Sequence, residues 1–72
     1  MELVGHVLRT QKTDDDRLQV EFRCTNTEEF YFYAPPAIQP PEGELIRVFT
    51  HLLDDEGGGR RREYVLNHWE KL

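Results

Sequence analysis

The chain has 72 residues, 38% of them hydrophobic, so it is predicted to form one domain, residues 1–72, with one small core. Its net charge of −5 and its pI near 5.0 argue against a protein that binds DNA mainly by neutralising phosphates, because that mode needs a basic surface. The single cysteine, Cys24, excludes an intrachain disulfide and indicates a reducing, cytoplasmic location. The N-terminal residues lack the pattern of a signal peptide, and no apolar run reaches the ~20 residues of a membrane helix, so no membrane association is expected.

Two strands are predicted in the first third of the chain. The first is Leu3 to Lys12, in which Gly5 indicates a bulge or a bend. Thr13 to Arg17, TDDDR, is a turn, because three adjacent aspartates favour a solvated reversal. Leu18 to Cys24 is the second strand and has the clearest alternation of apolar and polar residues. Its predicted core side chains are Leu18, Val20, Phe22 and Cys24, and its predicted solvent-facing ones are Gln19, Glu21 and Arg23. Cys24 is therefore expected to act as a small buried hydrophobic residue and not as a reactive thiol.

The third predicted strand, Glu28 to Ala34, carries four adjacent aromatic residues. Period-two alternation directs Phe30 and Phe32 to one side and Tyr31 and Tyr33 to the other. In one interpretation the phenylalanines fill the core and the tyrosines cover a second surface or flank a partner. In the other, the tyrosines form a platform on which nucleic-acid bases stack.

A proline-rich connection, Pro35 to Gly43, follows and interrupts the sheet, because proline cannot donate to a strand ladder. At most one helical turn is expected in it, at Ala37 to Gln39, with Ile38 tucked under the barrel. The chain then forms a long β-hairpin from Glu44 to Trp69. Its predicted arms are Leu45 to Leu53 and Tyr64 to Trp69, joined by the solvated stretch DDEGGGRRR.

The faces of this hairpin also follow from alternation. On the first arm one side holds Ile46, Val48, Thr50 and Leu52, and the other holds Leu45, Arg47, Phe49, His51 and Leu53. Neither side is purely polar, so one face is expected in the core and the other partly covered. The return arm sets Tyr64, Leu66 and His68 against Val65, Asn67 and Trp69, and residues 70–72 are expected to be frayed.

Five strands with one break, between the third and the fourth, are typical of a small all-β Greek-key barrel. The OB-fold places its helix or extended loop at that break. An SH3-like barrel is the alternative, because it also uses about five short strands. The lengths of the first two predicted strands favour the OB-like barrel, since both can bend around the two halves of a barrel.

The chain also resembles a known family. The run EGELIRVFTHLLDDEGGGRRREYVLNHW is similar to part of the N-terminal domain of the RuvA family of Holliday-junction-binding proteins, with Thr50, His51 and Leu52 at its centre and Tyr64 and Leu66 after the turn. Upstream, residues 29–35 and residues 1–8 are similar to that domain's third and first strands. The resemblance implies an OB-fold that packs at the centre of a tetramer and serves assembly beside DNA, most junction contacts coming from helix-hairpin-helix motifs in a following domain. The chain departs from the family at Thr27 to Glu29, where a glycine-rich start is usual, and in the longer loop around Gly57 to Gly59.

No pattern in the chain specifies a reaction, so no enzyme is predicted. His6, His51 and His68 lie on three different predicted strands without the close ligand pairs that are typical of structural zinc sites, so no metal or cofactor is expected. The aspartates and glutamates that cluster do so in turns, where solvation leaves nothing to tune for acid–base chemistry. The three adjacent glycines, Gly57 to Gly59, have no following Lys-Ser or Lys-Thr, which excludes a phosphate loop.

Two binding functions remain. The first is a non-catalytic interaction or assembly module, associated with DNA recombination and repair machinery, that binds a protein partner or itself. The second is a single-stranded nucleic-acid-binding barrel in which Tyr31 and Tyr33 stack on bases and arginines contact phosphates. Across both, the candidate binding residues are Arg23, Tyr31, Tyr33, Arg47, Phe49, His51, Arg60, Arg61 and Arg62.

Overall fold

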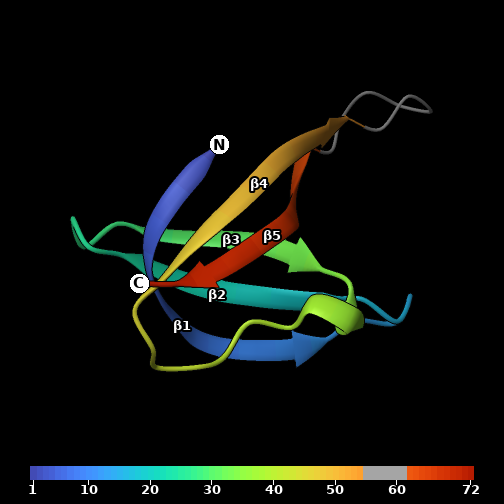
Figure 1. The fold of residues 1–72 in the computed structure, drawn as a ribbon. Coiled ribbons are helices and arrows are strands. Elements are labelled where there is room, and N and C mark those ends of the chain that lie inside the picture. The colour runs from blue at the N-terminus through green and yellow to red at the C-terminus, as the bar shows by residue number, and fades with distance from the viewer. Residues whose placement is uncertain (55–61) are drawn as a thin grey trace.

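The computed structural model, which describes residues 1–54 and 62–72, is an all-β barrel (Figure 1). Its elements are β1 (Glu2–Lys12), β2 (Leu18–Cys24), β3 (Glu29–Ala34), the short 3₁₀ turn η1 (Pro36–Ile38), β4 (Ile46–Asp54) and β5 (Arg62–Lys71). The barrel is closed in the order β1-β2-β3-β5-β4, with antiparallel neighbours everywhere except at β3 and β5, which are parallel. The prediction of an all-β, five-stranded closed barrel is confirmed.

Strand β1 serves both halves of the barrel, as its long curved path in Figure 1 shows. Its first residues pair with β4 and the rest pair with β2, and Gly5 takes part in both ladders, opposite Cys24 and Ile46. A Cβ atom on Gly5 would lie 2.0 Å from the carbonyl oxygen of Arg23, so only glycine fits there. A register shift between Val7 and Arg9 adds a bulge. The predicted bend or bulge in this strand is confirmed.

The core is built from the inward sides of the strands. The buried hydrophobic residues are Val7, Leu18, Val20, Phe22, Phe32, Ala34, Ile46, Val48 and Leu66. At its centre the rings of Phe22 and Phe32 lie 5.7 Å apart between centroids, in a tilted pair across β2 and β3. The alternation in β2 is confirmed, and Cys24 packs half-buried against the core.

The β4–β5 hairpin has one irregularity that changes which side chains reach the core. Phe49 pairs with His68 but Thr50 pairs with Leu66, so Asn67 is an extra residue in β5. The extra residue reverses the alternation, and Trp69 therefore packs against the core on the same side as Leu66, while His68 is exposed. The prediction that Leu66 and His68 share a face, opposite Trp69, is wrong for this reason.

The end of β5 is also longer than the sequence indicated. Arg47 pairs with Glu70 and Ile46 pairs with Lys71, so the prediction of a frayed end is wrong for residues 70 and 71. At the other end of the hairpin, Asp54 and Arg62 are still paired in the ladder. Both arms are extended because each ladder residue gains backbone hydrogen bonds whatever its side chain.

The proline-rich connection covers one end of the barrel. Ile38, in η1, packs against the core, and its carbonyl oxygen accepts a hydrogen bond of 3.0 Å from Nε1 of Trp69. Pro40, further along, is fully buried. The single helical turn and the position of Ile38 agree with the sequence prediction. This short turn is the one helical element in the described residues. No helix in that part of the chain is long and apolar enough to cross a membrane.

Candidate interaction face

The outward side of β2 and β3 carries the two tyrosines of β3. The strand register sets Gln19 opposite Tyr33, Glu21 opposite Tyr31 and Arg23 opposite Glu29. We call this surface the aromatic face; its members are Gln19, Glu21, Arg23, Glu29, Tyr31 and Tyr33. Three of the residues predicted for binding, Arg23, Tyr31 and Tyr33, are thus brought together on one surface.

Tyr31 is the exposed ring of the aromatic face, with 53% of its surface accessible. Its hydroxyl donates a hydrogen bond of 3.0 Å to Oε1 of Glu21 on the neighbouring strand. That hydrogen bond, together with the negative charge of Glu21, raises the pKa of Tyr31 above its ordinary value. The side chain is therefore held as a neutral hydrogen-bond donor next to a carboxylate.

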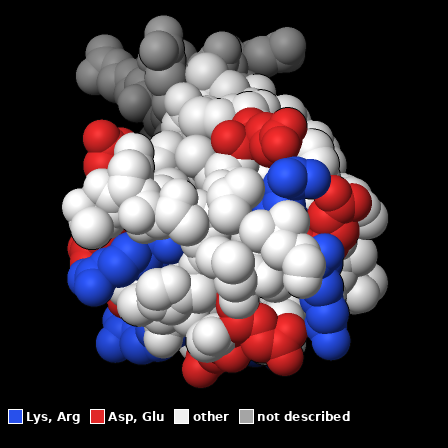
Figure 2. Space-filling model, turned by 60° about the vertical axis from the view of Figure 1, so that its left-hand side comes forward, with Lys and Arg blue, Asp and Glu red and all other residues white. Residues whose placement is uncertain are grey.

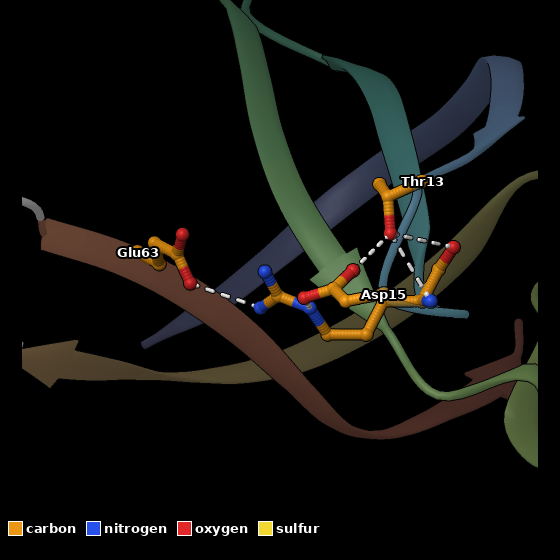
Figure 3. Close-up of polar contacts among 4 residues, drawn as sticks. Thr13, Asp15 and Glu63 are labelled. Carbon is orange, nitrogen blue, oxygen red and sulfur yellow. Dashed lines mark hydrogen bonds and ion pairs between the residues drawn. The ribbon is translucent and has the colours of Figure 1, made fainter.

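Tyr33 is covered by an arginine that the sequence analysis had placed only in a solvated turn. The guanidinium carbon of Arg17 lies 4.5 Å from the centroid of the Tyr33 ring, in a cation–π contact. Figure 3 shows how that guanidinium is held from two sides. Its Nε donates to Asp15 at 2.7 Å and its Nη1 donates to Glu63 of β5 at 2.9 Å. Arg17 thus reaches over β3 to join the β1–β2 turn to β5.

The turn that positions Arg17 is closed by Thr13. The backbone N–H of Thr13 donates to the carbonyl oxygen of Arg17 at 2.8 Å, and the N–H of Arg17 donates to Oγ1 of Thr13 at 3.1 Å. The Thr13 hydroxyl also hydrogen-bonds Asp15, and this contact, ahead of the one from Arg17, holds the pKa of Asp15 below its ordinary value. The hydrogen bond to Glu63 raises the pKa of Arg17 in turn. The turn is therefore an ordered support for Arg17.

Arg23, predicted as a phosphate contact, is engaged with a carboxylate. Its Nη2 lies 2.7 Å from Oε1 of Glu29, directly across the β2–β3 pair. An anion that approached Arg23 would have to compete with that carboxylate. Figure 2 shows acidic and basic side chains interleaved over the visible surface, with no single basic area.

Three further candidates, Arg47, Phe49 and His51, lie on a different surface, the outward side of β4, which they share with Leu53. We call these four residues the hairpin face. Arg47 lies 3.0 Å from a carboxylate oxygen of Glu2 and 3.1 Å from one of Glu70. Its Nε lacks a well-aligned hydrogen bond, so the pair with Glu2 is chiefly Coulombic.

On the hairpin face Phe49 is partly covered, as predicted, whereas His51 is exposed. Phe49 stacks on His68 with 5.8 Å between ring centroids, and Nδ1 of His51 contacts the side-chain oxygen of Asn67. The structure therefore does not unite the predicted site residues: three lie on the aromatic face and three on the hairpin face. Arg60 and Arg61 lie outside the described residues, and of Arg62 only the backbone, at the start of β5, is described.

Leucines at the far end of β4 were not among the predicted site residues. Leu53 on the hairpin face is 50% exposed and Leu52 is 40% exposed. Leu52 has the inward phase of Val48 and Thr50, yet it lies past the end of the buried part of the strand. The signal available in the sequence was the apolar pair immediately before the charged loop.

Metal-binding and thiol chemistry find no support in the described part of the chain. In residues 1–54 and 62–72, no three His, Cys, Asp or Glu side chains are grouped so that they could hold a metal ion. Burial, and then the nearby charge of Glu28, raises the pKa of Cys24, which disfavours the thiolate.

An open groove of about 370 Å³ lies beside the proline-rich connection, lined by Gln39, Pro40, Pro41, Glu42, Trp69 and Lys71.

No protein-family model, no curated protein and no solved structure was found to match this chain. A function for the aromatic and hairpin faces therefore has to be inferred from their own geometry.

Proposed function

We propose that this chain is a non-catalytic protein-interaction module built on an OB-type barrel. The observation that carries the proposal is the pairing of the arginines on both candidate faces with carboxylates. Arg23 contacts Glu29 at 2.7 Å, and Arg47 contacts Glu2 at 3.0 Å. Arg17 is held in the same way by Asp15 and Glu63. Guanidinium groups engaged in this way suit a surface that meets another protein better than one that neutralises a phosphate backbone.

The OB-type assignment rests on strand order and on the place of the break. Strand β1 pairs with both β2 and β4, the barrel closes through parallel β3 and β5, and the helical turn lies between β3 and β4. A five-stranded Greek-key barrel with its helix or loop at that place has the features of an OB-fold. The RuvA-like residues around Thr50 to Leu52 lie on β4, and they support a role in assembly beside cytoplasmic DNA recombination and repair machinery.

The partner that we propose for the hairpin face is a second copy of this chain. Leu53 is exposed at the far end of the hairpin face, and a twofold axis at that end would bring it against its own counterpart in the second copy. Burying one leucine side chain contributes roughly 1.5–3 kcal/mol, which suits a weak dimer assisted by other contacts.

Sedimentation velocity over a wide range of protein concentrations tests this proposal. We expect the sedimentation coefficient to rise with concentration, and Leu53→Ser to weaken association about ten-fold. Leu45→Ser is the matched control, because Leu45 is a similarly exposed leucine, at 53%, before the opposite end of β4. A monomer at every concentration, or equal effects of the two variants, would rule out self-association through this arm.

A second candidate function, binding of single-stranded nucleic acid, is favoured by one observation. Tyr31 presents an exposed ring, and base–aromatic stacking is worth about 1–3 kcal/mol per base. Fluorescence anisotropy of a labelled oligonucleotide, measured at several salt concentrations, tests it. Binding that Tyr31→Leu abolishes and that weakens steeply with salt would establish this function in place of the first.

A further inference from the structure

The aromatic face contains two tyrosines in similar surroundings, of which one already holds a cation. Tyr31 and Tyr33 are two residues apart on β3 and point outward together, and each lies opposite a residue of β2. Over Tyr33 lies the guanidinium of Arg17. Tyr31 has a carboxylate, Glu21, bound to its hydroxyl and a second one, Glu29, close enough to raise its pKa further.

The Tyr33 position shows what this face needs in order to hold an arginine. The ring supplies the negative face of a π system, and carboxylates at 2.7 and 2.9 Å accept hydrogen bonds from the guanidinium edge. Ring and carboxylates come from three different segments: β3, the β1–β2 turn and β5. The ring therefore contacts the flat face of the guanidinium while the carboxylates accept hydrogen bonds from the N–H groups at its edge.

The Tyr31 position has the same two kinds of group but none of the described residues supplies its cation. Among the side chains of residues 1–53 and 63–72, no arginine or lysine nitrogen lies within ion-pair distance of Glu21, and the cation–π contact that is found belongs to Tyr33. Of the arginines on the adjacent strands, Arg23 pairs with Glu29 at 2.7 Å, and Arg9, opposite Glu21 in the β1–β2 ladder, donates a hydrogen bond of 3.4 Å to Gln11. Tyr31 and Glu21 therefore form an accessible ring beside a carboxylate for which the described side chains provide no ion-pair partner.

We propose that Tyr31 and Glu21 bind an arginine side chain from a basic segment of a partner protein. The guanidinium would stack on the Tyr31 ring and donate to Oε2 of Glu21, the carboxylate oxygen that does not accept from Tyr31, as Arg17 does with Tyr33, Asp15 and Glu63. This names the class of partner for the interaction module proposed above and rests on that function. The net charge of −5 attracts a basic segment at long range.

Charge also favours this occupant over a nucleic acid. A base stacked on Tyr31 would bring its phosphates toward Glu21 and Glu29, and like charges repel. One positive charge also acts on this position. Arg9, opposite Glu21 on strand β1, lowers the pKa of Tyr31, but its effect is smaller than those of the two carboxylates. One arginine site is weak by itself, so the segment must carry several basic residues, each adding a small contribution.

The test is an NMR titration of the ¹⁵N-labelled full chain with a short flexible peptide that contains three arginines. Matched peptides contain lysine or the uncharged isostere citrulline at the same positions. We expect amide shifts centred on Tyr31 and Glu21, tighter binding of the arginine peptide than of the lysine peptide, and no binding of the citrulline peptide. Equal affinity for the citrulline peptide, or shifts centred on another surface, would overturn the proposal.

Variants test the assigned residues. Tyr31→Leu and Glu21→Gln should each weaken the arginine peptide about two- to five-fold, and Tyr31→Phe, which keeps the ring, should weaken it less than Tyr31→Leu. Glu44→Gln is the control for net charge, because Glu44 lies before β4, whereas Tyr31 and Glu21 lie on β3 and β2. The inference fails if Glu21→Gln and Glu44→Gln have the same effect. Well-dispersed amide spectra of every variant show that the fold is retained.

Sedimentation velocity and the peptide titration, made on the same protein, distinguish failure of this inference from failure of the proposed function. If the arginine peptide does not bind but the chain self-associates through Leu53 in sedimentation, only the inference about Tyr31 and Glu21 falls. If the peptide does not bind and the chain stays monomeric, the interaction module falls with it.

Discussion

Arg17, immediately before β2, donates a hydrogen bond of 2.9 Å to Glu63 of β5, and the two residues are 46 positions apart in the chain. Between them lies the junction of β3 and β5, where the ladder contains one parallel pair, Tyr33 with Val65. The Arg17 guanidinium lies over the ring of Tyr33 at that junction, 4.5 Å from the ring centroid. Figure 3 shows Glu63 of β5, which the guanidinium contacts. The ion pair therefore reinforces the part of the barrel with the shortest backbone ladder.

Loss of this ion pair should lower the free energy of unfolding. We expect Arg17→Gln or Glu63→Gln to cost about 0.5–1.5 kcal/mol, because the pair is only partly exposed and includes a charge-assisted hydrogen bond. The side chains of Arg17 and Glu63 are 33% and 20% accessible, respectively. Urea unfolding followed by circular dichroism measures the change. Arg23→Gln is the matched control, because its pair with Glu29 is 47% and 45% accessible and should contribute less. Equal costs at the two sites would contradict the role given to Arg17.

The turn that supports Arg17 should be sensitive to acid. The pKa of Asp15 in the folded chain lies below its ordinary value of 3.8, so its contribution to stability is present above that value and is lost as the pH falls through the folded-state pKa. We expect the urea concentration at the unfolding midpoint to decrease as the pH is lowered from about 4 through the folded-state pKa of Asp15. Asp15→Asn should make that decrease smaller. Asp14→Asn, in the same turn, is the control. An unchanged acid profile in Asp15→Asn would show that another group is responsible.

Gly5 should tolerate no side chain. A methyl group there would lie 2.0 Å from a backbone oxygen of β2, which cannot move without breaking the ladder. We expect Gly5→Ala to cost at least about 1–3 kcal/mol, as overpacking does, and to leave part of the chain unfolded. Gly43→Ala is the comparison, because the φ of +79° at Gly43 strains alanine although nothing lies within 4 Å. Thermal unfolding ranks the two, and a smaller loss for Gly5→Ala than for Gly43→Ala would contradict the close approach.

The ionisation of Tyr31 reports directly on its contact with Glu21. The pKa of Tyr31 is raised above 10.0 because the hydrogen bond and the charge of Glu21 favour the neutral hydroxyl. We expect Glu21→Gln to lower the pKa of Tyr31 toward its ordinary value, as measured by an NMR titration of the Tyr31 ring at high pH. The stability that this contact provides should be present below pH 10 and decline as the pH rises through the folded-state pKa. An unchanged pKa would mean that the two side chains are not in contact in solution.

The strands and their core faces could be predicted because period-two alternation records which side is buried. Val20 and Phe22 in β2 and Ile46 and Val48 in β4 are clear examples. The bulge at Asn67 could not be predicted, because an extra residue leaves the composition of the strand unchanged and appears only when the hairpin register is known. That is why Trp69 was expected on the wrong side.

The candidate site was predictable only in part for a similar reason. Alternation brings Tyr31 and Tyr33 together, since they lie on one strand. The pairing of Arg23 with Glu29 follows from the short β2–β3 turn, and that register was the missed signal. The position of Arg17 over Tyr33 depends on Glu63, far along the chain, and no local pattern indicates such a contact.

The most direct test of the central claim, that this barrel binds proteins and not nucleic acid, is an NMR titration of the labelled chain with a mixed-sequence single-stranded oligonucleotide at low salt. A duplex and a four-way junction serve as comparisons. We expect the amide signals of Arg23, Tyr31 and Tyr33 to stay unchanged with all three, because the nearby arginines are engaged with carboxylates. Shifts that cluster at those residues and disappear as salt is added would contradict the claim and establish direct nucleic-acid recognition.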